Sequence, residues 1–156
     1  MLLFLIRHAS AQNISKTGKD FDRHLTKEGV MQALKLGEYI CSLNVTMKHV
    51  YVSSSQRTRE TAKYALHSMS NIKYENSLYL PDSNELLKFI NDLEINGNLL
   101  ILGHNEGISS LASYLTNQNV GLNTANGVII EFDCNNSNEI SRDTGRLIDF
   151  FSPILF

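Results

Sequence analysis

The sequence is poor in the features that mark several classes of protein. It has two cysteines, Cys41 and Cys134, which stand far apart and match neither a metal-binding spacing nor a disulfide framework. No apolar stretch approaches the ~20 residues that a membrane-spanning helix needs. The 14 basic and 16 acidic residues form no long block of either sign, so nothing in the charge pattern indicates a protein that binds nucleic acid or a membrane surface.

Other missing patterns narrow the chemistry. The chain has no Gly-x-x-x-x-Gly-Lys-Ser/Thr loop, which argues against a nucleotide-dependent kinase. It has no cluster of histidine, cysteine and carboxylate residues at a metal-ligand spacing, so we expect neither a metal nor a cofactor. Residues 1–6 are too short for a secretory segment and run into Arg7 without a small-residue cleavage site, which favours a cytoplasmic protein.

The length and the apolar pattern predict one α/β domain over residues 1–156. With 156 residues and 42% hydrophobic content, the chain suits a single core. Apolar runs predict strands at residues 2–6, 49–52, 72–74, 99–102, 128–132 and 147–151. Helical periodicity predicts helices at about residues 27–43, 56–69, 83–93 and 107–115. This alternation is typical of a three-layer sandwich, with a mostly parallel central sheet and helices on both faces.

Polar residues mark where three of these helices begin. Thr26 is expected to cap the first helix, and the serines at 53–55 to supply hydroxyl caps for the second. Asp82 and Glu85 have the spacing of a capping box. Arg57 falls in the first turn of the second helix, where the helix dipole disfavours a cation, so a site that needs positive charge explains it better than helix stability does.

Two histidines directly follow predicted strands. Arg7 and His8 come after the first strand, and His104 comes after the strand at 99–102, with Gly103 and Gly107 around it. Open α/β sheets carry their chemistry at such strand ends. If the two strands are neighbours, both imidazoles meet at one edge of the sheet.

Four segments, in order, resemble motifs of the histidine phosphatase superfamily, to which the phosphoglycerate mutases also belong. Residues 7–11 resemble its Arg-His signature, and residues 20–29 resemble the Asp-x-Asp-Arg-Pro-Leu-x-x-x-Gly segment of its small SixA-like branch, the phosphohistidine phosphatases. Residues 53–62 are similar to its Ser-x-x-x-Arg-Ala-x-x-Thr-Ala helix start, and residues 102–107 to its Gly-His-Asn-Pro-Gly turn. The resemblance implies a histidine phosphatase fold, and the short distance from Arg57 to His104 leaves no room for a lid insertion.

The resemblance also implies a metal-independent phosphatase that forms a transient phosphohistidine on His8, with Arg7, Arg57 and His104 binding the phosphoryl group. The residue types suit this chemistry. A neutral imidazole can attack phosphorus, which divides one difficult displacement into two easier ones. Guanidinium groups bind phosphate oxygens in bidentate fashion and compensate their charge.

The proton donor for the leaving group is less defined. Glu106 stands where the family pattern has proline; it is either an acid aimed at the site or a first-turn residue stabilised by its helix dipole. Asp20, Asp22 and Glu85 are each either an acid or a bracing group. The remaining candidates are expected to be structural: Arg59, His49, His67, and His24 in place of the family's proline.

An open site without a lid favours a phosphorylated side chain of another protein as substrate. We therefore expect phosphohistidine on a partner, such as a histidine phosphotransfer domain, with inorganic phosphate as product. An imidazole leaves easily once it is protonated, so a weak acid suffices. The alternatives are a small-molecule phosphomonoesterase or mutase of the same superfamily, and a regulatory module that binds phosphate without catalysis; a purely structural α/β domain is a third.

Overall fold

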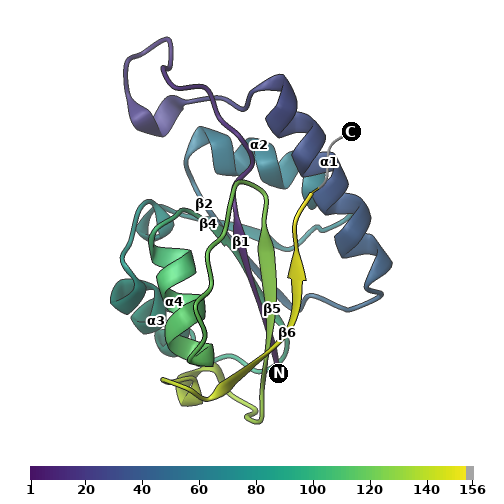
Figure 1. Ribbon diagram of the computed structural model, residues 1–156, viewed down its shortest axis with the longest axis vertical. Coiled ribbons are helices and arrows are strands. Elements are labelled where there is room, and N and C mark those ends of the chain that lie inside the picture. The colour runs from purple at the N-terminus through teal and green to yellow at the C-terminus, as the bar shows by residue number, and fades with distance from the viewer. Residues whose placement is uncertain (154–156) are drawn as a thin grey trace.

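The fold is built on a six-stranded sheet with the strand order β3-β2-β4-β1-β5-β6 (Figure 1). The computed structural model describes residues 1–153; positions 154–156, which the expected single domain includes, lie outside the described residues. The strands are β1 (Leu2–Arg7), β2 (His49–Ser53), β3 (Ile72–Glu75), β4 (Leu99–Gly103), β5 (Gly127–Phe132) and β6 (Gly145–Phe151). The helices are α1 (Lys27–Ser42), α2 (Gln56–Ala65), α3 (Ser83–Asp92) and α4 (Gly107–Thr116), with the short 3-10 helices η1 (Asp20–Asp22), η2 (Asn76–Leu78) and η3 (Ser137–Glu139).

The sheet is mixed but mostly parallel, which confirms the expected fold class. Strands β1, β2, β3 and β4 pair in parallel, whereas β5 pairs antiparallel with β1 and β6 antiparallel with β5. Helices α1 and α2 cover one face, and α3 and α4 cover the other (Figure 1). No helix within residues 1–153 is long and apolar enough to cross a membrane.

The alternation of side chains along β1 explains why both faces are covered. Leu3 and Leu5 pack in the core under α3 and α4, while Phe4 and Ile6 pack in the core under α1 and α2. Residues two apart in a strand point to the same face, so a strand that is apolar throughout needs helices on both sides. Packing on both faces fixes the central strands β1 and β4. It thereby also fixes the residues that directly follow these strands.

The neighbouring strands β1 and β4 bring the two predicted histidine segments together. Arg7 at the end of β1 pairs in register with Gly103 at the end of β4. The backbone N–H of His8 continues this pairing by donating to the Gly103 carbonyl over 3.0 Å. His8 and His104 therefore leave the sheet at the same edge, as the sequence predicted.

Two of the three predicted helix caps are present and one prediction is wrong. The Thr26 hydroxyl accepts a hydrogen bond from the Gly29 N–H over 2.9 Å, and Asp82 with Glu85 forms a full capping box. The serines at 53–55 do not cap α2, because the N-cap residue Ser55 makes no side-chain cap bond. Its hydroxyl lies 2.7 Å from that of Thr58 instead. The helix also ends at Ala65, earlier than expected.

Candidate active site

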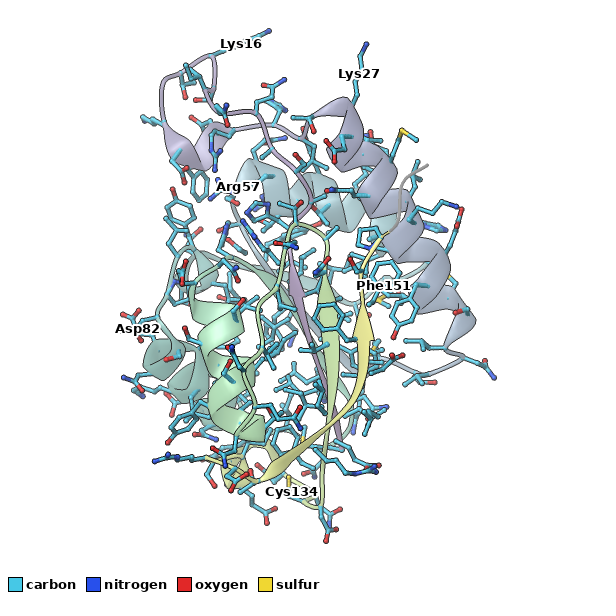
Figure 2. The ribbon with its side chains drawn as sticks, viewed as in Figure 1. Lys16, Lys27, Arg57, Asp82, Cys134 and Phe151 are labelled. Atoms are coloured by element: carbon cyan, nitrogen blue, oxygen red, sulfur yellow. The ribbon has the colours of Figure 1, made fainter. Side chains whose placement is uncertain are left out.

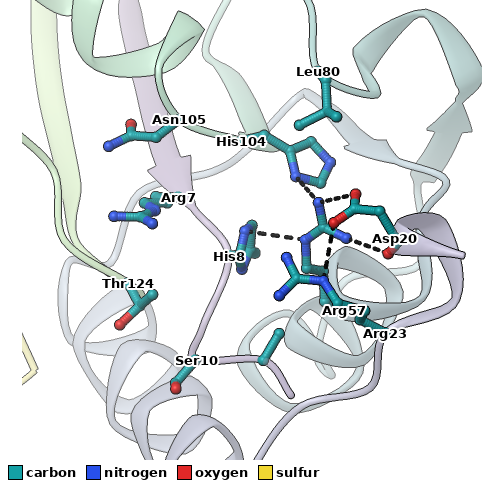
Figure 3. A pocket seen from close by; sticks show the side chains of 11 residues that line it. Arg7, His8, Ser10, Asp20, Arg23, Arg57, Leu80, His104, Asn105 and Thr124 are labelled. Atoms are coloured by element: carbon teal, nitrogen blue, oxygen red, sulfur yellow. Dashed lines mark hydrogen bonds and ion pairs between the residues drawn. The ribbon is translucent and has the colours of Figure 1, made fainter. Parts of the chain in front are cut away.

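His8 lies at the centre of the edge where the parallel strands end, between Arg7 on one side and Arg57 on the other (Figure 3). The residue is 7% exposed. Its Nδ1 lies 2.7 Å from the carbonyl oxygen of Ala9, which can only accept, so Nδ1 carries the proton and donates. The lone pair is therefore on Nε2. This is the tautomer that a nucleophilic imidazole needs.

The electrostatic surroundings keep His8 neutral. Burial lowers the pKa of the His8 imidazole to about 3, although the Ala9 carbonyl raises it, and the charges of Arg57 and Arg7 lower it further. An imidazolium here would have to lie unsolvated beside guanidinium groups. At neutral pH, His8 thus presents an unprotonated Nε2.

Arg57 is almost fully buried and makes hydrogen bonds from all three of its nitrogens. Its Nε donates to His8 Nε2 over 3.2 Å, and its Nη1 donates to the Asp20 carbonyl oxygen over 2.8 Å. Its Nη2 lies 3.0 Å from the Asp20 carboxylate and 3.2 Å from His104 Nδ1. The first turn of α2 thus delivers a guanidinium between the two imidazoles, which accounts for a cation at a position that the helix dipole disfavours.

His104 shares the buried site but has its own hydrogen-bond partners. Because Arg57 Nη2 can only donate, His104 Nδ1 must accept, and the proton lies on Nε2. Nε2 is 2.8 Å from the Ser53 hydroxyl and therefore donates to it. Burial, His8 and Arg57 lower the pKa of His104 to about 2. His104 lines the same pocket as His8. The predicted contact between His104 and a bound phosphoryl group remains a prediction.

Arg7 contributes the second guanidinium. Its Nη1 donates to the Leu122 carbonyl oxygen over 2.9 Å. Its Nε is buried and has no hydrogen-bond partner among residues 1–153. A buried guanidinium N–H without an acceptor is costly unless a ligand supplies one, and a phosphate oxygen is such an acceptor.

Asp20 supplies the carboxylate that holds the arginines in place. It forms ion pairs of 3.0 Å with Arg57 Nη2 and with Arg23 Nε, and it accepts a hydrogen bond of 2.5 Å from the Tyr79 hydroxyl. Partial burial raises the pKa of the Asp20 carboxyl, but the Tyr79 hydroxyl and the Arg57 charge outweigh burial, so this pKa lies below its usual range. An ionised Asp20 braces the site and is a poor proton donor.

The loop that carries η1 is fastened to the site by a close backbone approach. The Ser10 N–H donates to the Gln32 side chain over 2.8 Å, and the Ser10 carbonyl accepts from the Thr26 N–H over 3.0 Å. A Cβ on Gly29 would lie 2.0 Å from that carbonyl oxygen, so only glycine fits. On the other side, the Thr61 hydroxyl accepts from the Ala9 N–H over 3.1 Å. These contacts account for the glycine and threonine of the second and third motif segments.

The other three candidate acids lie outside the pocket. Glu106 is exposed and lines two neighbouring grooves. Glu85 completes the capping box of α3. Asp22 accepts a hydrogen bond from the Thr17 hydroxyl within its own loop. Of the carboxyl groups in the described chain, Asp20 alone lines the pocket.

The pocket is small, open and cationic, with a volume of about 290 Å³. Three guanidiniums face one carboxylate in its wall, and both imidazoles are neutral. No group of three or more histidine, cysteine or carboxylate side chains that could hold a metal ion occurs within residues 1–153. Figure 2 shows Arg57 in the upper half of the molecule and Cys134 near its lower end, so that cysteine is remote from the pocket. The arrangement suits a dianionic oxyanion beside a nucleophilic nitrogen.

Several residues of this site were not predicted as site residues, among them Arg23, Ser53 and Tyr79. Arg23 was visible within the second motif segment, and Ser53 was visible within the third but was interpreted as a cap. Tyr79 follows η2, and no sequence motif marked it as a site residue. Its contacts with Asp20 and His104 depend on the tertiary fold. Conversely, Arg59, His24, His49 and His67 lie outside the pocket lining, in line with their expected structural roles.

Comparison with protein families agrees with this geometry. The sheet gathers histidines and arginines where its parallel strands end, an arrangement that suits the binding of a phosphoryl group. The family model of the histidine phosphatase superfamily (branch 1) matches residues 3–78, which include three of the four motif segments. Over this segment, which is just under half of the chain, the sequence is that of a histidine phosphatase superfamily member.

Two curated proteins are similar to parts of the sequence. An uncharacterized chloroplastic protein of Arabidopsis thaliana is 25% identical over 142 residues, which cover 83% of this chain and 65% of that protein. The mitochondrial serine/threonine-protein phosphatase PGAM5 of Xenopus tropicalis is 35% identical over 75 residues, 48% of this chain and 26% of that protein. The chain thus spans less than two thirds of either relative.

Solved structures share the fold over nearly the whole chain. A protein assigned as the phosphohistidine phosphatase SixA of Nakamurella multipartitia has a TM-score of 0.84 at 21% identity, covering 99% of this chain and 96% of that one. The protein histidine phosphatase SixA complexed with tungstate has a TM-score of 0.81 at 17% identity, covering 97% of both chains. A phosphoserine phosphatase of Entamoeba histolytica has a TM-score of 0.71 at 15% identity, also covering 97% of both chains. These likenesses establish a small histidine phosphatase fold without a lid.

Proposed function

We propose that the protein is a phosphohistidine phosphatase that passes the phosphoryl group of a protein partner through a covalent intermediate on His8. The observation that carries this proposal is the tautomer of His8. Nδ1 donates to the Ala9 carbonyl, and the lone pair on Nε2 lies in a cationic pocket. With a pKa of about 3, His8 is neutral and nucleophilic at physiological pH.

The reaction consists of two displacements at phosphorus. In the first, the Nε2 lone pair of His8 forms a bond to phosphorus, the bond from phosphorus to the donor nitrogen breaks, and the leaving imidazole takes up a proton from solvent. In the second, water attacks the phosphorus, the bond to Nε2 breaks, and inorganic phosphate leaves. Arg7 and Arg57 bind the equatorial oxygens and compensate their charge in both steps.

The carboxyl groups favour phosphohistidine over an alkyl phosphate as substrate. Within the described chain the pocket has one carboxyl group, Asp20, and ion pairing with Arg57 and Arg23 keeps it ionised. An alkoxide leaving group needs a strong proton donor, whereas an imidazole is protonated readily near neutral pH. The likeness in fold to SixA proteins supports the same substrate class.

The shape of the site favours a macromolecular substrate. The segment between Arg57 and His104 forms β3, η2, α3 and β4, so no domain covers the pocket. Ile14, in the loop before η1, and Leu80, on the pocket wall, are 78% and 51% exposed. An open pocket encloses a small metabolite poorly but admits a phosphorylated side chain that projects from another protein. A phosphorylated histidine phosphotransfer domain fits this description, and a cytoplasmic location remains part of the proposal.

The test is a rapid quench without acid, using a histidine phosphotransfer protein labelled on its phosphoryl group. We expect transient label on the phosphatase, located at His8, followed by release of inorganic phosphate. His8→Ala should abolish both while the fold is retained. His49→Ala is the matched control, because His49 lies at the opposite end of β2 and its side chain, within residues 1–153, bonds to the Asn96 carbonyl alone.

Other outcomes would point to the alternatives. Faster turnover of a small phosphate ester than of any phosphohistidine protein would favour a small-molecule phosphomonoesterase. Binding of the phosphoprotein without turnover would favour a regulatory module. An unchanged rate in His8→Ala would remove His8 as the nucleophile.

A further inference from the structure

A closed ring of hydrogen bonds joins the first turn of α4 to the segment before β5. The Leu122 N–H donates to the Ser109 hydroxyl over 3.0 Å, and the Ser109 hydroxyl donates to Asn105 Oδ1 over 2.6 Å. Asn105 Nδ2 then donates to the Leu122 carbonyl oxygen over 2.8 Å, which closes the ring. Each group donates to the next in the same direction, an arrangement in which hydrogen bonds polarise and strengthen one another.

One member of this ring, the Leu122 carbonyl oxygen, also binds Arg7. Leu122 O accepts from Arg7 Nη1 over 2.9 Å as well as from Asn105. The Leu122 side chain is buried in the core under α3 and α4, so this residue is fixed from both sides. With Nη1 occupied, the opposite edge of the guanidinium, formed by Nε and Nη2, remains for an oxyanion. Nε on that edge is the buried atom without a partner in the described chain.

We propose that Ser109 is a positioning residue for phosphoryl binding, acting through Asn105 and Leu122 on the guanidinium of Arg7. Arg7 and Asn105 lie side by side in the pocket lining (Figure 3). Ser109 is not part of that lining but lines a neighbouring groove, to which Arg7 and Asn105 also contribute. Without the hydroxyl, Asn105 Oδ1 and the Leu122 N–H both lose a partner, and the carbonyl that orients Arg7 is no longer fixed. The bidentate geometry of a guanidinium on an oxyanion depends on that orientation. The inference deepens the proposed function, since it concerns the same pocket.

The test measures binding of tungstate, an oxyanion held by a structural relative of this chain. Ser109→Ala is expected to weaken tungstate binding by about 3- to 10-fold, the range for losing one or two buried hydrogen bonds that act indirectly. Ser109→Thr keeps the hydroxyl and should bind as the wild type does. Ser110→Ala is the matched control, because Ser110 is the exposed neighbour of Ser109 on α4 and has no part in the ring.

A double-mutant cycle with Arg7→Ala separates positioning from a general structural effect. In the Arg7→Ala background, Ser109→Ala should change tungstate binding by less than about 1.5-fold, because the residue through which it acts is absent. An equal loss in both backgrounds, an equal loss in Ser110→Ala, or no loss at all would overturn the proposal. Ser109→Cys, which has a similar volume but a weaker donor, replaces Ser109→Ala if that variant does not fold. Tungstate binding requires no turnover, so this result is independent of whether the protein hydrolyses phosphohistidine.

Discussion

Arg57 donates a hydrogen bond from Nε to the Nε2 of His8 over 3.2 Å, although the two residues are 49 positions apart in the sequence. The bond occupies the lone pair that would attack phosphorus. In-line attack needs that lone pair to be free. The Arg57 N–H must therefore transfer its hydrogen bond from His8 Nε2 to an oxygen of the phosphoryl group when the substrate binds. Arg57 therefore orients the imidazole in the structure, and in the proposed reaction it would also stabilise charge on the phosphoryl group during transfer.

Arg57→Lys should lower kcat/KM by about 100- to 1,000-fold, because an ammonium cannot contact His8, His104 and the phosphoryl oxygens together. The measurement is steady-state phosphate release. Arg59→Lys is the control: Arg59 is exposed and stacks 4.1 Å from the Tyr74 ring, outside the pocket. Similar losses in both variants would contradict a specific role for Arg57.

Glu106→Gln should leave kcat/KM within about 2-fold of the wild-type value, because the carboxylate is exposed and lines grooves beside the pocket. The pH profile of phosphate release is the measurement. If Glu106 were the proton donor, Glu106→Gln would remove the limb of the profile that reports a protonated acid. That result would return Glu106 to the catalytic machinery.

The stability of the protein should fall as the pH is lowered from neutral. The folded-state pKa values of His8 and His104 are about 3 and 2, whereas an unfolded histidine titrates near 6.5. Between these values the unfolded chain binds protons that the folded chain does not, so each histidine lowers the free energy of unfolding by up to about 1.4 kcal/mol per pH unit. Urea unfolding at about pH 7, 6 and 5 measures this slope.

Removing one of these histidines should flatten that slope. We expect a shallower fall in His104→Gln, because the glutamine has no proton to gain on unfolding. His67→Gln is the matched control variant, because the His67 side chain is exposed and, within residues 1–153, bonds to the Tyr64 carbonyl alone. Equal slopes in the wild type and in His104→Gln would show that His104 does not titrate on unfolding.

Gly29→Ala should destabilise the protein by about 1–3 kcal/mol, the usual range for overpacking, and lower its activity. Alanine favours a helix over glycine by about 1 kcal/mol, but a Cβ only 2.0 Å from the Ser10 carbonyl oxygen forces the loop away from α1. At Gly121 nothing lies within 4 Å of the position that a Cβ would take, so Gly121→Ala should change stability by less than about 0.5 kcal/mol. Thermal unfolding of both variants checks this contrast.

Local patterns predicted most of the fold. Continuous apolar runs identified β1 and β4 as buried strands, and helical spacing with a threonine cap identified α1. The resemblance to a family identified His8, Arg7, Arg57 and His104, which the structure gathers at one pocket. Such predictions succeed because burial and capping depend on residues close together in the chain.

The contacts that organise the pocket depend on residues far apart in the chain. A serine before a helix normally caps it, but the Ser53 hydroxyl meets His104 because β2 and β4 are neighbours. Likewise, Asp20 becomes a clamp for Arg57 only because its loop folds over α2. The spacing of residues in the sequence does not predict the contact of Ser53 with His104 or that of Asp20 with Arg57. For this reason, the sequence left the bracing role of Asp20 as one of several alternatives.

The connection between η2 and α3 runs along the wall of the pocket. Tyr79 is bonded to Asp20, Leu80 forms part of the wall, and Pro81 presses so closely on α4 that Gly107 has no space for a side chain. Additional residues inserted here would lie beside the pocket that Leu80 lines, outside the strands of the sheet. The length of this one connection therefore controls how far the pocket is enclosed, independently of the sheet that carries His8 and His104.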